Sequence, residues 1–145
     1  IHTFTTGSAP SLQYLQFSIR GDRYKLIYNP YRHKNYLAAS RYTNSKLPKD
    51  QHVKDFLFPD EYELFDLGKD PYEWKNLARS PEYQKKKQEL IAAMKAFQRE
   101  IKDPFVDKEN MDQFEAEQIE HQKINYRKKK GFRWPHLELF EKANR

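Results

Sequence analysis

Residues 31–60 carry side chains that could bind an anionic sugar. Aromatic and cationic residues are interleaved there, at Tyr31, Arg32, His33, Lys34, Tyr36, Arg41 and Tyr42. Aromatic rings stack and attract cations, while Arg and Lys donate charge-assisted hydrogen bonds to anionic oxygens. The composition therefore suits a sulfated sugar, although each residue taken singly is also ordinary for a loop surface.

Two further groups of cations could contact a ligand. Arg20, Arg23 and Lys25 form a basic run that could meet an anionic glycan or could simply keep a hairpin hydrated. The segment "YRKKKGFRWPH", residues 126–136, combines Lys and Arg with Tyr, Phe and Trp. That combination is typical of surfaces that follow a nucleic-acid backbone and stack on its bases.

The positive charge of the chain is concentrated at its C-terminal end. The formal net charge is +6, but residues 1–118 hold 19 Lys and Arg against 18 Asp and Glu. Residues 119–145 hold 8 against 3. A nucleic-acid-binding or protein-interaction module is therefore an alternative that depends on the tail, because the body is nearly neutral.

The composition excludes several kinds of catalytic site. The chain has no cysteine, so disulfides, thiolate metal sites and cysteine nucleophiles are ruled out. His33 and His52 lack a third metal ligand at a useful spacing. No apolar run approaches the roughly 18 residues that a membrane-spanning helix needs. No catalytic or metal centre is evident, and we leave open whether the protein is an enzyme.

The hydrophobic patterns predict an α+β fold, in which a small antiparallel sheet of three to four strands packs against one long amphipathic helix. We expect strands at 1–6, 12–20, 24–29 and 60–67, a break at 7–11, a tight turn at 21–22, and a long loop at 31–60 with one helical turn near 53–57. Because "IHTFTTGSAP" begins without Met in a strand-like segment, we expect it to be interior to a longer polypeptide.

The stretch "YELFDLGKDPYEWKNLARSPEYQ", residues 62–84, predicts a rigid corner between a strand and a helix. Gly68 allows the reversal, and residues 70–73 have the form of a capping box around one helical turn. In that reading Asp70 accepts from free backbone amides and Glu73 reaches back. Trp74 and Leu77, three residues apart, are expected to enter the same core.

A long helix should follow the corner. "SPE" at residues 80–82 is a helix-start signal, and Asp103-Pro104 is a stop signal. The predicted buried stripe consists of Tyr83, Leu90, Ile91, Met94, Phe97 and Ile101. Beyond it, a weaker stripe at Met111, Phe114, Gln118 and His121 predicts a second helix, and we expect a further helical turn within residues 136–145.

The runs "SIRGDRYKLIYN", "YELFDLGKDPYEWKNLA" and "SPEYQKKKQELIAAMKAFQREIKDPF" resemble the C-terminal subdomain of the sulfatase family. Within that family, "IKDPFV" resembles the heparan N-sulfatase (sulfamidase) branch. The resemblance covers residues 1–106, which we take as the subdomain, and leaves residues 107–145 as a basic C-terminal extension. Its most specific part is the pattern D-P-x-E-x-x-N-L between a strand and a Pro-started helix.

The resemblance implies that this chain is a non-catalytic part of a larger hydrolase. In the family, the small sheet and its helix dock beside an α/β catalytic domain, which would lie upstream in the same polypeptide. The corner would hold the helix across one face of the sheet and leave the other face for docking. Ile27, Phe65 and Leu67 would then need a cover, either from that domain or from residues 105–145.

The family's chemistry has no counterpart in these residues. Sulfatases cleave sulfate esters or sulfamates with a formylglycine, made from Cys or Ser in a C/S-x-P-x-R motif, beside a Ca²⁺ ion. The nearest match here begins at Ser8 and has Leu12 where the motif needs Arg. We therefore expect the formylglycine and the Ca²⁺ in the upstream domain, and we expect this chain alone to be inactive.

The resemblance also implies candidate substrate contacts. The entry to the family's subdomain lies near the active-site mouth, so His2 could hydrogen-bond a sugar hydroxyl or a sulfate, unless it is an ordinary strand residue. With Arg20, Arg32 and His33, it makes up our predicted substrate-binding set. Phe17 stands where the family often has the first Arg of R-[ST]-[VI]-R, which weakens any transfer of specificity.

The resemblance further implies a sulfated glycan as substrate and an extracytoplasmic location, whether periplasmic, secreted or lysosomal. Neither follows from composition or spacing. No membrane partner is expected, and nucleic acid is the less favoured partner.

Overall fold

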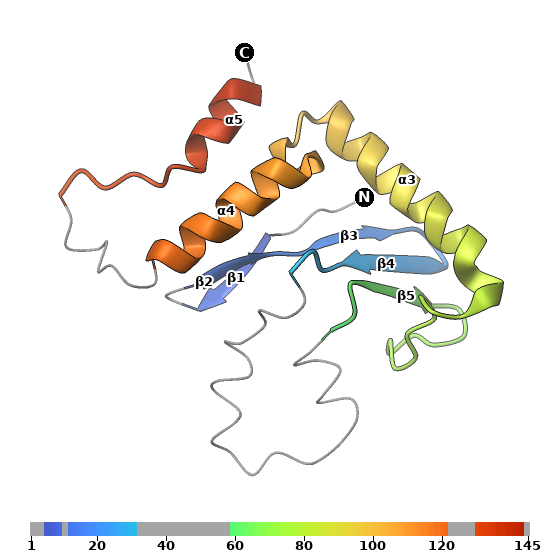
Figure 1. Cartoon of the computed structure of the whole chain (residues 1–145). Coiled ribbons are helices and arrows are strands. Elements are labelled where there is room, and N and C mark those ends of the chain that lie inside the picture. The colour runs from blue at the N-terminus through green and yellow to red at the C-terminus, as the bar shows by residue number, and fades with distance from the viewer. Residues whose placement is uncertain (1–4, 10–11, 32–58, 122–129, 144–145) are drawn as a thin grey trace, which may run out of the picture.

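A computed structural model of the chain describes residues 5–9, 12–31, 59–121 and 130–143. Within these residues, helices α3 and α4 lie over one side of two small antiparallel sheets (Figure 1). The predicted α+β class is confirmed. None of the described helices is long and apolar enough to span a membrane.

Five strands form the two sheets. β1 (Thr5–Ala9) pairs with β2 (Leu12–Leu15), and the larger sheet has the order β3 (Phe17–Arg20), β4 (Tyr24–Tyr28), β5 (Tyr62–Asp66). The predicted strand at 12–20 is therefore divided at Gln16, since its first half pairs with β1 and its second half with β4. The predicted strands at 24–29 and 60–67 are confirmed as β4 and β5.

The predicted break after residue 6 is wrong. β1 continues through Gly7 to Ala9, which pairs with Leu12. The register shifts between Thr6 and Ala9, so the glycine is accommodated as an irregularity in a two-stranded ladder. Residues 1–4 and the predicted helical turn at 53–57 lie outside the described residues.

The long helix is confirmed. Of its predicted buried stripe, only Met94 is fully buried, and Ile101, which lies after the last helical residue, is 48% exposed, so its inclusion was wrong. A 3-10 turn, η2 (Pro81–Tyr83), leads into α3 (Gln84–Glu100). The helix ends where Lys102 adopts a left-handed φ of 53° and Asp103 takes over as a cap. The Asp103 carboxylate accepts from the Phe105 amide at 2.9 Å and starts η3 (Pro104–Val106). Asp103-Pro104 is thus the stop that the sequence predicts.

The tail contributes two more helices, α4 (Lys108–His121) and α5 (Leu137–Ala143). Both agree with the weaker helical patterns. Of the predicted α4 stripe, Met111, Phe114 and Gln118 are buried.

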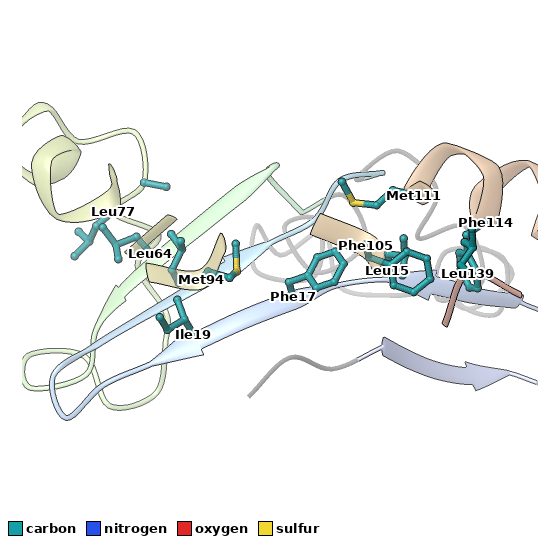
Figure 2. Packing of buried hydrophobic residues seen from close by; sticks show 12 residues of the cluster. Leu15, Phe17, Ile19, Leu64, Leu77, Met94, Phe105, Met111, Phe114 and Leu139 are labelled. Carbon is teal, nitrogen blue, oxygen red and sulfur yellow. The ribbon is translucent and has the colours of Figure 1, made fainter. Parts of the chain in front are cut away.

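One hydrophobic cluster joins the sheet to the three described helices. Its buried members are Leu15, Phe17, Ile19, Leu26, Leu64, Leu77, Ala78, Met94, Phe105, Met111, Phe114 and Leu139. Figure 2 shows Leu15, Phe17 and Ile19 pointing to the same side of the β2–β3 ribbon. Alternate residues of an extended chain share a face, so these strands present one continuous apolar side to the helices.

A row of stacked aromatic rings extends this face toward Tyr28, at the C-terminal end of β4. Phe17 stacks on Tyr28 with ring centroids 6.0 Å apart, and Tyr28 stacks on Tyr62 at 4.8 Å. These are cross-strand neighbours in the sheet, and such pairs stabilise strand pairing. Phe17 is 2% exposed, so an arginine at this position could not be accommodated without burying a charge.

The helices of the tail pack on the α3 side of the sheet. Phe105, Met111, Phe114 and Leu139 all belong to the cluster on that side. The opposite face is nevertheless not bare: Phe65 is only 5% exposed, while Ile27 and Leu67 are partly exposed. Of the three residues expected to need a cover, Phe65 is thus already buried.

A core truncation should show how much the fold depends on this one-sided cluster. Leu64 has no exposed surface and contributes to the cluster. We expect Leu64→Ala to lower the free energy of unfolding by about 3 kcal/mol, as buried Leu-to-Ala changes do. In urea titrations, Leu137→Ala is the matched control, because Leu137 is 40% exposed and its loss should cost less than about 1 kcal/mol. Equal losses would contradict this core.

Candidate functional site: the corner between β5 and α3

The corner begins with a reversal directly after β5. The backbone amides of Lys69 and Asp70 both donate to the Asp66 carbonyl, at 3.0 and 2.8 Å. Gly68 does not have a positive φ, and an added Cβ would lie 3.4 Å from the Asp66 carboxylate, within ordinary contact, so this turn does not depend on glycine as the sequence predicted. The chain thus leaves the sheet in a tight turn, as predicted.

A single carboxylate closes the next loop. Asp70 accepts from the Lys75 amide at 2.8 Å, and hydrogen bonds from the amides of Lys75, Trp74, Tyr72 and Glu73 lower the pKa of its carboxyl. Asp70 therefore accepts hydrogen bonds from backbone amides, as the sequence predicts. The predicted helical turn does not form, however: residues 70–75 make a closed loop of turns.

Glu73 has a different role from the one predicted. It adopts a left-handed φ of 59° and does not reach back to a cap. Its carboxylate instead bonds the Lys25 ammonium at 2.6 Å. Lys25 is the cross-strand partner of Phe65, so the corner covers part of the sheet face that was expected to be open.

Asn76 fastens the corner to the edge of the sheet. Its side-chain oxygen accepts from the amides of Leu64 and Ala78 at 3.0 and 2.9 Å. Its NH₂ group donates to the Tyr62 carbonyl and to the Asp60 carboxylate, both at 3.2 Å. The next amide, that of Leu77, donates to the Leu64 carbonyl at 2.8 Å. Residues 76–77 therefore bond to β5 much as a further strand would.

An ion pair between an exposed arginine and a buried carboxylate braces the end of β5 that leads into the corner. Arg23 binds the Asp66 carboxylate in a bidentate manner, at 2.9 and 2.8 Å. The Asp66 side chain is only 1% exposed. The guanidinium of Arg23 lowers the pKa of Asp66 and is itself held charged, since its own pKa is raised by the same bonds.

Two aromatic side chains of the corner are largely exposed. Leu77 is buried as predicted, but Trp74 is 60% exposed and Tyr72 is 78% exposed. The prediction that Trp74 enters the core is therefore wrong. It assumed helical spacing between Trp74 and Leu77, and the closed loop at 70–75 removes that spacing.

The described residues that flank the predicted long loop lie at the other end of the sheet. Asn29 donates to the Asp60 carbonyl and to the Glu63 carboxylate, both at 2.9 Å, and accepts from Gln16 at 2.8 Å. Asp60 also forms an ion pair with Arg79. Side-chain bonds therefore join the two points where the loop enters and leaves the sheet.

Tyr31, the last described residue before the loop, is anchored to α4. Its hydroxyl bonds Asp112 at 2.5 Å, and the Lys108 ammonium lies 5.0 Å from its ring centroid. Burial, followed by the bond to Asp112, raises the pKa of Tyr31. Burial also raises the pKa of nearby Tyr62, to about 12, so these phenols stay neutral at physiological pH.

The structure locates one of the four predicted substrate-binding residues. Arg20 is exposed at the end of β3, opposite Lys25 of β4. His2, Arg32 and His33 lie outside the described residues. Tyr31 follows the far end of β4, so the described chain places Arg20 and the start of the long loop at opposite ends of the sheet.

The basic aromatic tail offers less free surface than its sequence indicates. Trp134 contacts both Phe132 and His136, with ring centroids 5.1 and 5.7 Å apart. Arg133 forms an ion pair with Glu141. Tyr126 lies outside the described residues. In the described part of the tail, packing within the chain therefore engages the side chains that would otherwise stack on bases.

A buried pair in the tail was missed from the sequence. Glu117 accepts from the backbone amide of His136 and contacts its Nδ1, both at 2.7 Å. Their side chains are 5% and 11% exposed. No spacing rule relates residues 19 positions apart, so the sequence carried no signal for this contact. It fixes the approach to α5 against α4.

The described residues do not fit the metal and nucleophile of a sulfatase. Among them, no three His, Cys, Asp or Glu side chains are grouped so as to hold a metal ion. Ser8 lies within β1, paired to β2, and belongs to no C/S-x-P-x-R motif.

The fold and the corner together define a two-layer α+β domain built to hold one helix across a small sheet. Comparison of the sequence with models of known protein families and with curated proteins found no match.

Removing the Asn76 side chain should loosen the corner. Asn76→Ala leaves the amides of Leu64 and Ala78 without their acceptor, and we expect a loss of about 2 kcal/mol in the free energy of unfolding. Asn110→Ala is the matched control, because Asn110 makes one bond, to the Pro104 carbonyl, and its loss should cost about 1 kcal/mol or less. Chemical denaturation of the two variants side by side measures the difference.

The Arg23–Asp66 pair predicts a specific acid sensitivity. The folded-state pKa of Asp66 lies below its ordinary 3.8, so its stabilisation is present above that pH and is lost as the pH falls through the folded pKa. We expect Asp66→Asn to be less stable near neutrality and to lose stability less steeply on acidification. Asp22→Asn, in the exposed β3–β4 turn, is the matched control for removal of one carboxylate charge. Parallel profiles for wild type and Asp66→Asn would refute this role.

Proposed function

We propose that this chain is the C-terminal, non-catalytic subdomain of a sulfatase of the heparan N-sulfatase (sulfamidase) kind. The intact protein would hydrolyse sulfate esters or sulfamates of a sulfated glycan. The supporting observation is the corner, because four of the five defining residues of D-P-x-E-x-x-N-L have a physical task there. Asp70 closes the loop, Glu73 bonds the sheet, Asn76 bonds the β5 edge and Leu77 enters the core.

In this proposal the chain completes the fold of a larger enzyme. The α/β catalytic domain would lie upstream in the same polypeptide. The helices fill one side of the sheet, so the side with partly exposed Ile27 and Leu67 is the one we assign to that domain. Such an inter-domain contact need not be large, because contacts within one polypeptide avoid much of the entropic cost of association.

The reactive groups would belong to the upstream domain. There, a formylglycine would supply the nucleophile and a Ca²⁺ ion would stabilise charge on the sulfate oxygens. This chain would help to shape the substrate mouth, with His2, Arg20, Arg32 and His33 as its candidate contacts. The family resemblance supports an extracytoplasmic location.

The test is sulfate release by the intact natural polypeptide, expressed with its maturation machinery. We expect release from an aryl sulfate, which carries an O–S bond, or from N-sulfoglucosamine, which carries an N–S bond. In the same preparation, Asn76→Ala should lower the yield of folded enzyme and leave KM close to wild type, because Asn76 holds the corner.

Two results would contradict the proposal. One is a folded intact protein that releases no sulfate from either substrate. The other is a natural transcript that encodes no catalytic domain ahead of the segment. Activity against the N–S substrate alone would identify the sulfamidase branch.

A further inference from the structure

The chain is held over the three residues that follow β4. Asn29 is buried, and its side-chain NH₂ donates to the Asp60 carbonyl at 2.9 Å. Pro30 comes next, and its ring holds φ at about −65°. The Tyr31 hydroxyl then donates to the Asp112 carboxylate at 2.5 Å. The fixed part of this segment therefore extends as far as Tyr31, the last described residue before position 59.

The side chains that hold Tyr31 come from α4, which belongs to the predicted C-terminal extension. Lys108 forms an ion pair with Asp112, and its ammonium lies 5.0 Å from the Tyr31 ring centroid. A hydroxyl that donates to a carboxylate makes a charge-assisted bond, which is stronger than a bond between neutral groups. The ring of Tyr31 also packs against the hydrophobic cluster. We call these three residues, Tyr31, Lys108 and Asp112, the tyrosine anchor.

The tyrosine anchor lies directly ahead of two candidate glycan contacts. Arg32 and His33 follow Tyr31 in sequence, and both lie outside the described residues. Consecutive Cα atoms are about 3.8 Å apart, so a fixed Tyr31 limits the positions that Arg32 can reach. Without the anchor, the last side chain bonded to the sheet would be that of Asn29. Order that exists before a ligand arrives is not lost from the free energy of binding.

We propose that the tyrosine anchor positions the glycan contact of this chain, with Asp112 as a positioning residue that acts through Tyr31. This inference rests on the proposed function, in which Arg32 and His33 contact a sulfated glycan. The anchor itself would touch no sugar. The C-terminal extension would then contribute to substrate affinity as well as to the core.

The charges of the anchor are compatible with an anionic ligand nearby. An unpaired carboxylate next to Arg32 would repel sulfate groups. Asp112 is instead paired with Lys108 and accepts from the Tyr31 hydroxyl, and these two bonds lower the pKa of its carboxyl. The tyrosine anchor therefore carries no net charge at neutral pH, and it fixes the phenol without an uncompensated negative charge.

The experiment compares glycan affinity with stability in the full 145-residue chain. Calorimetric titration with a heparin-derived tetrasaccharide gives Kd, and urea titration gives the free energy of unfolding. Tyr31→Phe removes only the hydroxyl, and we expect it to raise Kd about fivefold because the bond to α4 is lost. Its stability should fall far less than that of Leu64→Ala, since the ring still packs against the cluster.

Variants of Asp112 separate positioning from packing. Asp112→Ala should raise Kd as much as Tyr31→Phe does, and the double variant should bind no more weakly than either one, because both changes remove the same bond. Asp112→Glu keeps a carboxylate and should recover part of the affinity. Glu109→Ala is the matched control: it removes one exposed carboxylate from the same helix and should bind at least as tightly as wild type.

Three results would overturn this inference. The first is Tyr31→Phe or Asp112→Ala binding the tetrasaccharide as tightly as Glu109→Ala does. The second is effects of the two changes that add in the double variant. The third is no binding by the wild-type chain at millimolar concentration.

None of these readouts depends on sulfate release, so the two proposals can fail separately. An active intact sulfatase whose glycan affinity is the same with and without the tyrosine anchor would refute this inference alone. Glycan affinity that depends on the anchor, in an intact protein that releases no sulfate, would refute the proposed function alone.

Discussion

The structure depends on how the free edge of β5 is satisfied. β5 is an edge strand in the order β3-β4-β5, and edge strands present unpaired backbone groups that invite association with other chains. Here residues 76–77 take that place: Leu64 donates to the Asn76 side chain and accepts from the Leu77 amide. The Leu64 side chain meanwhile lies fully buried near Leu77 and Met94 (Figure 2). One residue thus joins the sheet, the corner and the helix.

This constraint determines where α3 can go. Once residues 76–77 are fixed along β5, the chain has only Ala78 to Ser80 in which to turn before Pro81 begins the helical segment. Gln84 and Lys87 strengthen the turn by donating to the Ala78 carbonyl. The helix therefore starts at one end of the sheet and crosses its apolar face, where Met94 meets the cluster. Helix α4 then continues the helical layer over β2, so the face of the sheet away from the helices has less cover.

Much of this architecture could be predicted from the sequence, because its signals are local. Alternation in β4 and β5, the Pro81 start and the Asp103-Pro104 stop all act within a few residues of the chain. The cluster residues Leu64, Leu77 and Met94 follow from the same periodicities. The prediction failed where one local sequence pattern is compatible with two backbone conformations. "DPYE" can cap a helix or close a loop, and the pairing of Glu73 with Lys25, a long-range contact, decided for the loop.

The site was harder to predict than the fold for the same reason. Trp74 has helical spacing to Leu77 in sequence, yet the closed loop turns it into solvent. The Glu117–His136 pair and the anchoring of Tyr31 by Asp112 join segments far apart in the chain, and no motif marks either. Composition alone could identify cations and rings as candidate ligand contacts. Which of the described ones gather at one end of the sheet depends on strand register, and the register separates Arg20 from Tyr31.

Hydrogen exchange at single amides tests the central claim most directly. If the corner is an integral edge of the sheet, the amides of Leu64, Leu77 and Ala78 should exchange slowly and through a common opening with that of Leu26, at the free energy of global unfolding. Rapid exchange of the Leu77 and Ala78 amides, alongside a protected Leu26, would show that the corner opens independently of the sheet and would contradict this account.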